Sequence, residues 1–180
     1  NFRICGAVRY CGHGPGGLLM KPVLDLTCGA RMMWVNKHDE RVTYCDNTAE
    51  THTLCDGRTL TINPDQREDF RDLSFPDNTF YLVVFDPPHL NHLGESSWLA
   101  KKYGKLAPSW EDDIRAGFEQ AFRVLRPGGV LIFKWNETQI PLSRILTLTP
   151  EKPLFGHTGT SSKTHWITFL KTPTSKGTQQ

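Results

Sequence analysis

Short apolar runs without polar interruption recur along the chain, bounded by Gly, Pro, Asp or Lys. The clearest lie at 82–85 and 130–133. Such runs favour strands that are covered on both faces, as in a parallel sheet. Between them, apolar residues repeat at helical spacing, which predicts an amphipathic helix over 110–125. Its buried stripe is expected to be Ile114, Phe118, Ala121, Phe122 and Leu125. The alternation of strand and helix indicates an α/β fold.

The segments between these runs predict further elements. Asp56-Gly57 between two alternating runs is a strong hairpin signal, so a β-hairpin is expected within 51–63. Ser109, followed by acidic residues, has the character of a capping box at the start of the amphipathic helix. Further strands are expected at 23–26, 41–46, 154–155 and 164–170, a helix through 32–35, and a short helix over 141–148.

The composition is that of a globular protein, with 38% hydrophobic and 22% charged residues in 180 positions. A formal net charge of +2 is too small to argue nucleic-acid binding by itself, although it leaves room for a local basic patch. No apolar run approaches the roughly 18 residues that span a membrane, and no secretory pattern is present. We therefore expect a cytoplasmic protein without a membrane partner.

The five cysteines, Cys5, Cys11, Cys28, Cys45 and Cys55, all lie in the N-terminal third. Their odd number favours reduced thiols in a cytosolic protein. Cys5 and Cys11 together with His13 are an alternative set of zinc ligands, but no Cys-x-x-Cys pair accompanies them. We expect no metal site.

The run at 82–85 stops at Asp86-Pro87-Pro88-His89. Two consecutive prolines cannot donate to a sheet ladder, so the chain must leave the sheet at Asp86. A carboxylate, a rigid turn and an imidazole are thereby expected at the carboxyl end of a strand, where open α/β sheets bind ligands.

This tetrapeptide resembles the (Asp/Asn/Ser)-Pro-Pro-aromatic signature of class I S-adenosylmethionine (SAM) methyltransferases that modify amino nitrogens, with His89 in the aromatic position. The resemblance covers about 23–170 and implies a Rossmann-like fold. That fold has a mostly parallel seven-stranded sheet, an antiparallel C-terminal strand and helices on both faces. It implies catalytic roles for Asp86, Pro87, Pro88 and His89. The small layout also resembles stand-alone DNA methyltransferases of phages and mobile elements.

The stretch from 23 to 31 resembles the first cofactor motif of the same family, an acidic residue on the first strand followed by a Gly-containing turn. The resemblance implies that Cys28, Gly29 and Ala30 approach the methionine part of SAM, where a side chain would obstruct the backbone. Asp25 could pair with the cofactor amine, or be a buried carboxylate that caps the turn. A Gly-x-Gly-x-x-Gly fingerprint is absent, which counts against NAD.

Two later acidic positions fit the remainder of the cofactor. Asp46 follows the turn by about 20 residues, a spacing at which an acid commonly binds ribose hydroxyls; an ordinary strand-end turn is the alternative. By resemblance, Asp69 would accept from the adenine amine and Phe70 would contact its ring.

The segment after the Pro-Pro turn combines aromatic and basic residues, Trp98, Lys101, Lys102 and Tyr103. Aromatics that stack and lysines that bind phosphate would suit an extruded base or a single strand, whereas a solvated surface helix is the plainer interpretation. Lys134 and Asn136 follow the strand at 130–133 and either line the substrate mouth or cap the next helix.

The sequence thus predicts methyl transfer from SAM, leaving S-adenosylhomocysteine, to an exocyclic amino nitrogen. Adenine N6 in DNA is the first candidate, with an accessory protein possible for target recognition. RNA, a protein amide and a small-molecule amine are alternatives, as is a SAM-binding module without catalysis. The domain would span 23–170, preceded by a flexible or lid-like segment at 1–22 and followed by a polar tail at 171–180.

Overall fold

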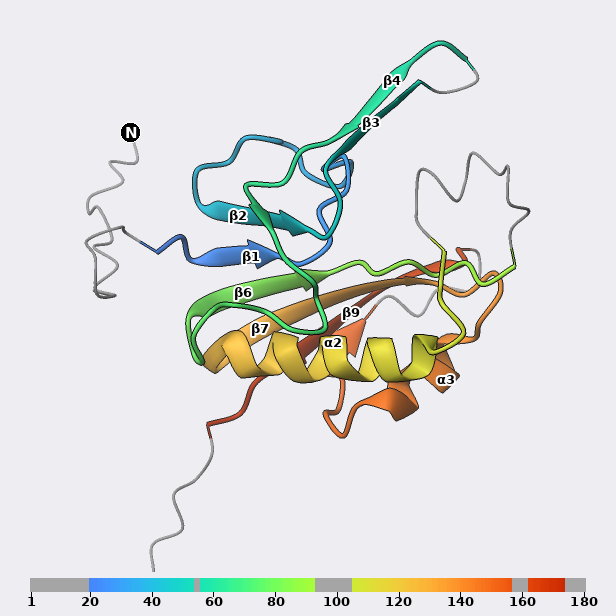
Figure 1. Ribbon diagram of the computed structural model, residues 1–180. Coiled ribbons are helices and arrows are strands. Elements are labelled where there is room, and N and C mark those ends of the chain that lie inside the picture. The colour runs from blue at the N-terminus through green and yellow to red at the C-terminus, as the bar shows by residue number, and fades with distance from the viewer. Residues whose placement is uncertain (1–19, 54–55, 93–104, 157–161, 174–180) are drawn as a thin grey trace, which may run out of the picture.

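The computed structural model describes residues 20–53, 56–92, 105–156 and 162–173. A seven-stranded sheet forms its centre (Figure 1). Its strands are β1 (Val23–Asp25), β2 (Val42–Asp46), β5 (Gln66–Arg67), β6 (Phe80–Phe85), β7 (Leu125–Asn136), β8 (Phe155–Gly156) and β9 (Thr164–Leu170).

The strand order is β5-β2-β1-β6-β7-β9-β8, and the predicted topology is confirmed. Strands β5, β2, β1, β6 and β7 run parallel, whereas β9 is antiparallel to both β7 and β8. The chain moves outward from β1 to β2 and β5, then returns to the other side of β1 to form β6. The order therefore reverses between β1 and β6, and sheets of this kind bind ligands at the carboxyl ends of such strands.

Helix α2 (Trp110–Val124) packs on β6 and β7, where the sequence predicts it. Phe118 of the helix meets Phe85 and Phe133 of the sheet, with ring centroids 5.9 and 4.8 Å away. The expected capping box does not form, because the Ser109 hydroxyl donates to the Asp113 side chain and makes no bond to a backbone amide. Helix α3 (Leu142–Ile145) and the 3-10 turn η1 (Leu146–Leu148) complete this hydrophobic core.

The predicted hairpin consists of β3 (Glu50–Thr53) and β4 (Thr59–Ile62), which pair antiparallel as a separate two-stranded sheet. Figure 1 shows it projecting from the main sheet beyond the carboxyl end of β2. It connects β2 to β5, so its base lies beside the carboxyl ends of the parallel strands.

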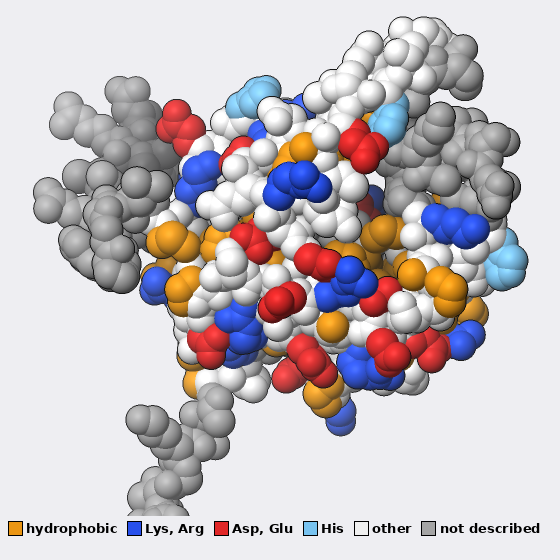
Figure 2. Space-filling view, viewed as in Figure 1, with side chains coloured by type: hydrophobic (Ala, Val, Ile, Leu, Met, Phe, Trp, Pro, Cys, Tyr) orange, Lys and Arg blue, Asp and Glu red, His pale blue; other side chains and the backbone are white. Residues whose placement is uncertain are grey.

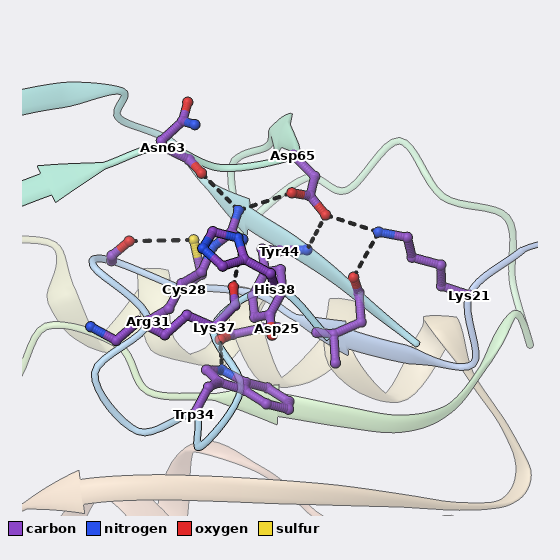
Figure 3. A network of polar contacts seen from close by, with 12 residues as sticks. Lys21, Asp25, Cys28, Arg31, Trp34, Lys37, His38, Tyr44, Asn63 and Asp65 are labelled. Atoms are coloured by element: carbon purple, nitrogen blue, oxygen red, sulfur yellow. Dashed lines mark hydrogen bonds and ion pairs between the residues drawn. The ribbon is translucent and has the colours of Figure 1, made fainter. Parts of the chain in front are cut away.

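The expectation of a helix through 32–35 is wrong, because this segment forms successive turns. Arg31 adopts a left-handed conformation with φ of 55°. Its guanidinium donates to the carbonyls of Lys37 and Asn63 and pairs with Asp65 at 2.9 Å (Figure 3). It also lies 3.9 Å above the Tyr44 ring. These contacts hold the chain in a turn that cannot start an α-helix.

Trp34, within these turns, covers the end of β1. Its indole Nε1 donates to the fully buried Asp25 carboxylate at 2.6 Å, and the Thr27 amide donates to the other oxygen at 3.2 Å. Burial raises the pKa of Asp25 to about 7, although both hydrogen bonds oppose the shift. Asp25 therefore caps the turn, as one of the two interpretations predicts.

The predictions for 1–19, 98–103 and 174–180 lie outside the described residues. Within the described part of the chain, no helix is both long and apolar enough to cross a membrane.

The raised pKa of Asp25 predicts a pH-dependent stability. An unfolded Asp ionises near pH 4, whereas the folded carboxyl keeps its proton until about pH 7. The free energy of unfolding therefore decreases as the pH rises between these values. Asp25→Asn cannot ionise. We expect wild-type stability to fall relative to Asp25→Asn by roughly 1–3 kcal/mol between pH 5 and 8, measured by urea unfolding.

Asp39→Asn is the matched control, because the half-buried Asp39 pairs with Arg41 and has its pKa lowered to about 2. It is ionised throughout this range, so its effect on stability should not vary with pH. A difference between wild type and Asp25→Asn that stays constant from pH 5 to 8 would contradict the prediction.

Candidate active site

A cavity of about 440 Å³ lies at the carboxyl ends of β1, β2 and β6. Its size falls in the range of small-molecule pockets. One wall is the turn after β1, a second is the Pro-Pro turn after β6, and a third is the β3–β4 hairpin. The predicted residues Cys28, Gly29, Ala30, Asp46, Phe70, Asp86, Pro87, Pro88, His89 and Lys134 all line it.

The turn after β1 presents its backbone to the cavity. Gly29 has a φ of +48°, a conformation that glycine adopts without strain, and a Cβ there would enter open space. Its amide donates to Asp46 Oδ2 at 2.9 Å, and the Cys28 amide donates to the Cys45 carbonyl at 2.8 Å. Strand β2 thus fixes a turn whose exposed backbone a ligand can approach closely.

Asp46 links this turn to the hairpin. Its second oxygen accepts from the Thr48 amide at 3.0 Å and from the Thr48 hydroxyl at 2.9 Å. A carboxylate oxygen can accept more than one hydrogen bond. Ribose binding by Asp46 stays a prediction that its position on the cavity wall permits.

Asp86 stands where β6 ends. Its amide donates to the Thr27 hydroxyl at 3.0 Å, which ties it to the turn after β1. Its carboxylate accepts from Lys134 Nζ at 2.5 Å. Burial raises the pKa of Asp86, and the Lys134 ammonium opposes that shift. Asp86 is thereby held at this edge of the sheet through its amide by the turn after β1 and through its carboxylate by β7.

His89 completes the Pro-Pro turn. Its ring lies edge-on to Trp135, with centroids 6.2 Å apart. Burial lowers the pKa of His89, while Asp86 and a hydrogen bond to the Pro87 carbonyl oppose the shift. The imidazole is therefore uncharged near neutral pH.

Not every predicted residue reaches the cavity. Phe70 does, packing 5.3 Å from Phe85 between ring centroids. Asp69 instead binds Arg71 at 2.6 Å, and that guanidinium lowers the pKa of Asp69. Asn136 donates to the Thr164 hydroxyl at 3.1 Å, and Asp25 lies under the turn. Cofactor contacts by Asp25 and Asp69, and a substrate contact by Asn136, stay predictions without a cavity position.

Sequence reasoning missed the hairpin wall. Glu50 and His52 of β3 line the cavity, joined at 2.8 Å, and Leu60 and Ile62 of β4 line it as well. The signal was present in the sequence, because Asp46 ends β2 and the hairpin follows it directly.

Thiol and metal chemistry find no support in the described part of the chain. Burial raises the pKa of Cys28 to about 12, and that of Cys45 is also raised by burial, so neither is a ready nucleophile. No group of three or more metal-ligating side chains occurs among the described residues.

No protein-family model matches the sequence, and no curated protein matches it. Solved structures share the fold. The PH0226 protein from Pyrococcus horikoshii OT3 has a TM-score of 0.52 at 15% identity, over 83% of this chain and 81% of that chain.

A SAM-dependent methyltransferase from Methanosarcina mazei has a TM-score of 0.47 at 13% identity, over 86% of this chain and 94% of that one. A putative S-adenosyl-L-methionine-dependent methyltransferase from Methanococcus maripaludis has a TM-score of 0.48 at 12% identity, over 84% and 77%. At 15% identity, the likeness to the PH0226 protein concerns the fold alone.

Proposed function

We propose that this chain is a SAM-dependent methyltransferase that acts on an exocyclic amino nitrogen, with adenine N6 in DNA as the first candidate. The observation that carries the proposal is that Gly29 and Asp86-Pro87-Pro88-His89 line one cavity at the reversal of strand order. A cofactor-binding turn and an amine-binding turn would then face each other across it.

The cavity wall suits the charge of SAM. Asp46, Glu50 and Asp86 carry carboxylates there, against Lys134 as the one lysine or arginine among the described lining residues. SAM carries a sulfonium and an ammonium against one carboxylate, so its net charge is positive. The open space beside Gly29 and the ring of Phe70 would accommodate the methionine and adenine parts respectively.

When bound, SAM supplies an electrophilic methyl group. The chain has to place a nitrogen in line with it. An aromatic amine is a poor nucleophile because its lone pair is delocalised into the ring. Asp86 and the Pro87 carbonyl would accept its N–H groups and draw the nitrogen toward tetrahedral geometry. Positive charge develops there during transfer, so these acceptors bind the transition state more tightly than the ground state.

The prolines and His89 support this arrangement. Pro87 and Pro88 have no N–H groups that would compete with the substrate, and their rings restrict the backbone. The uncharged imidazole of His89 can stack on a base as Tyr would, with a smaller ring.

A protein amide or small-molecule amine is the second candidate. The observation in its favour is that acidic and basic side chains are interspersed on the face seen in Figure 2, without a broad basic region over α2. Arg71, Arg115, Arg123 and Arg144 on and around this helix each pair with an acid. These four arginines, each already paired with an acid, would be poor contacts for a phosphate backbone.

The activity is tested with isotopically labelled SAM and unmethylated duplex DNA, single-stranded DNA, RNA and amine-bearing peptides, followed by mass spectrometry of the products. Asp86→Ala should lower transfer on the order of 100-fold or more, because it removes an acceptor that acts in the transition state. Calorimetry should show that the variant retains S-adenosylhomocysteine binding. Asp77→Ala, on an exposed residue paired with Arg123, is the control. Label transfer that survives in Asp86→Ala would refute the role of Asp86.

Gly29→Ala tests the cofactor turn. Gly29 and Gly128 both have positive φ with open space at the Cβ position, so alanine strains both backbones alike. Only Gly29 lines the cavity. We expect Gly29→Ala to weaken S-adenosylhomocysteine binding about tenfold or more, and Gly128→Ala to lower stability without changing affinity. Equal affinities of the two variants would place the cofactor elsewhere.

A further inference from the structure

Lys134 approaches Asp86 because of the sheet register. Val84 pairs with Ile132 and Phe85 with Phe133, so Asp86 and Lys134 come next on adjacent parallel strands. Side chains alternate along β7, and Lys134 points away from the core that Phe133 and Trp135 occupy. Its Nζ lies 2.5 Å from Asp86 Oδ2.

The pair is shielded from water. The Asp86 and Lys134 side chains are only 19% and 26% exposed, and the lysine ammonium also lies 5.6 Å from the centre of the Trp166 ring. An unpaired carboxylate in such a place would be strongly disfavoured, so the ammonium is needed for the carboxylate to remain charged. The other titratable groups that act on Asp86 are Asp25 from β1 and His89 from the same segment.

The backbone and the side chain of Asp86 are each held by a different neighbour. Thr27 holds its amide, and Lys134 holds one carboxylate oxygen. The remaining oxygen keeps its acceptor capacity, and the pair as a whole carries no net charge. A second ammonium brought to this carboxylate would meet Lys134 at close range, whereas a neutral NH₂ group would not.

We propose that Lys134 is a positioning and specificity residue, which orients the Asp86 carboxylate and cancels its charge, so that the site takes a neutral planar amino group and disfavours an alkylammonium ion. The substrate class is then an arylamine, such as a nucleobase, or an amide. This inference rests on the proposed role of Asp86 as the amine acceptor. A merely structural ion pair would tie β6 to β7 without affecting which amine binds.

The first test is the carbon-13 NMR titration of Asp86, assigned with Asp86→Asn. Lys134→Met keeps the length of the side chain and removes its charge, Lys134→Arg keeps a charge, and Lys152→Met is an exposed control. We expect the pKa of Asp86 to rise by about one unit or more in Lys134→Met and to stay near wild type in the other two variants. An unchanged titration in Lys134→Met would overturn the proposal.

The second test measures specificity without catalysis. Binding of 9-methyladenine and of n-butylammonium is followed by NMR at pH 7 with S-adenosylhomocysteine present. The preference of the wild type for the neutral probe should fall about tenfold or more in Lys134→Met and persist in Lys134→Arg. A ratio of affinities that is the same in wild type and Lys134→Met would overturn the specificity role.

The third readout is the pH profile of methyl transfer. The ionised Asp86 carboxylate is a stronger acceptor than the protonated acid. The acid limb of the kcat profile should therefore move to higher pH in Lys134→Met, with kcat restored near pH 9 and KM little changed. A kcat loss that is uniform across pH would mark a structural role. If the wild type transfers label to none of the acceptors, the proposed function fails, while the titration and the probe ratio still decide the role of Lys134.

Discussion

The structure depends on one backbone constraint, the exit of the chain from the sheet at Asp86. Strand β6 is hydrogen-bonded to β1 on one side and β7 on the other, so it cannot shift along the sheet. Two prolines then end its ladder. Because the position of the last strand residue is fixed by both neighbours, so is the first residue outside it. Asp86 therefore lies between the turn that contains Thr27 and the strand that contains Lys134.

Strand β6 and the centre of β7 could be predicted because each is a short apolar run in the sequence, whereas β5 (Gln66–Arg67) has no such signal. The absence of a helix at 32–35 could not be predicted, since it depends on residues that are distant in the sequence. Arg31 turns left-handed and is held there by Asn63 and Asp65, more than thirty residues along the chain. Tertiary contacts of this kind override the local preference of Met, Trp and Val segments.

The site residues whose location depends on the end of a strand could be predicted. Those whose location depends on which side chains pair with one another could not. Gly29, Asp46 and Asp86 reach the cavity because Asp46 ends a parallel strand and the other two each follow one. Asp69 is not among the residues that line the cavity, and its carboxylate pairs with Arg71, two residues on. The contact of Lys134 with Asp86 follows from the register of β6 and β7, which a single sequence does not specify.

The separateness of the β3–β4 hairpin has an evolutionary consequence. Its ladder shares no hydrogen bonds with the seven-stranded sheet, yet four of its side chains form a wall of the cavity. Insertions, deletions or wholesale replacement between Asp46 and Asp65 would therefore leave the register of the main sheet intact. Selection could replace this wall of the cavity as a unit while the turns after β1 and β6 are inherited unchanged.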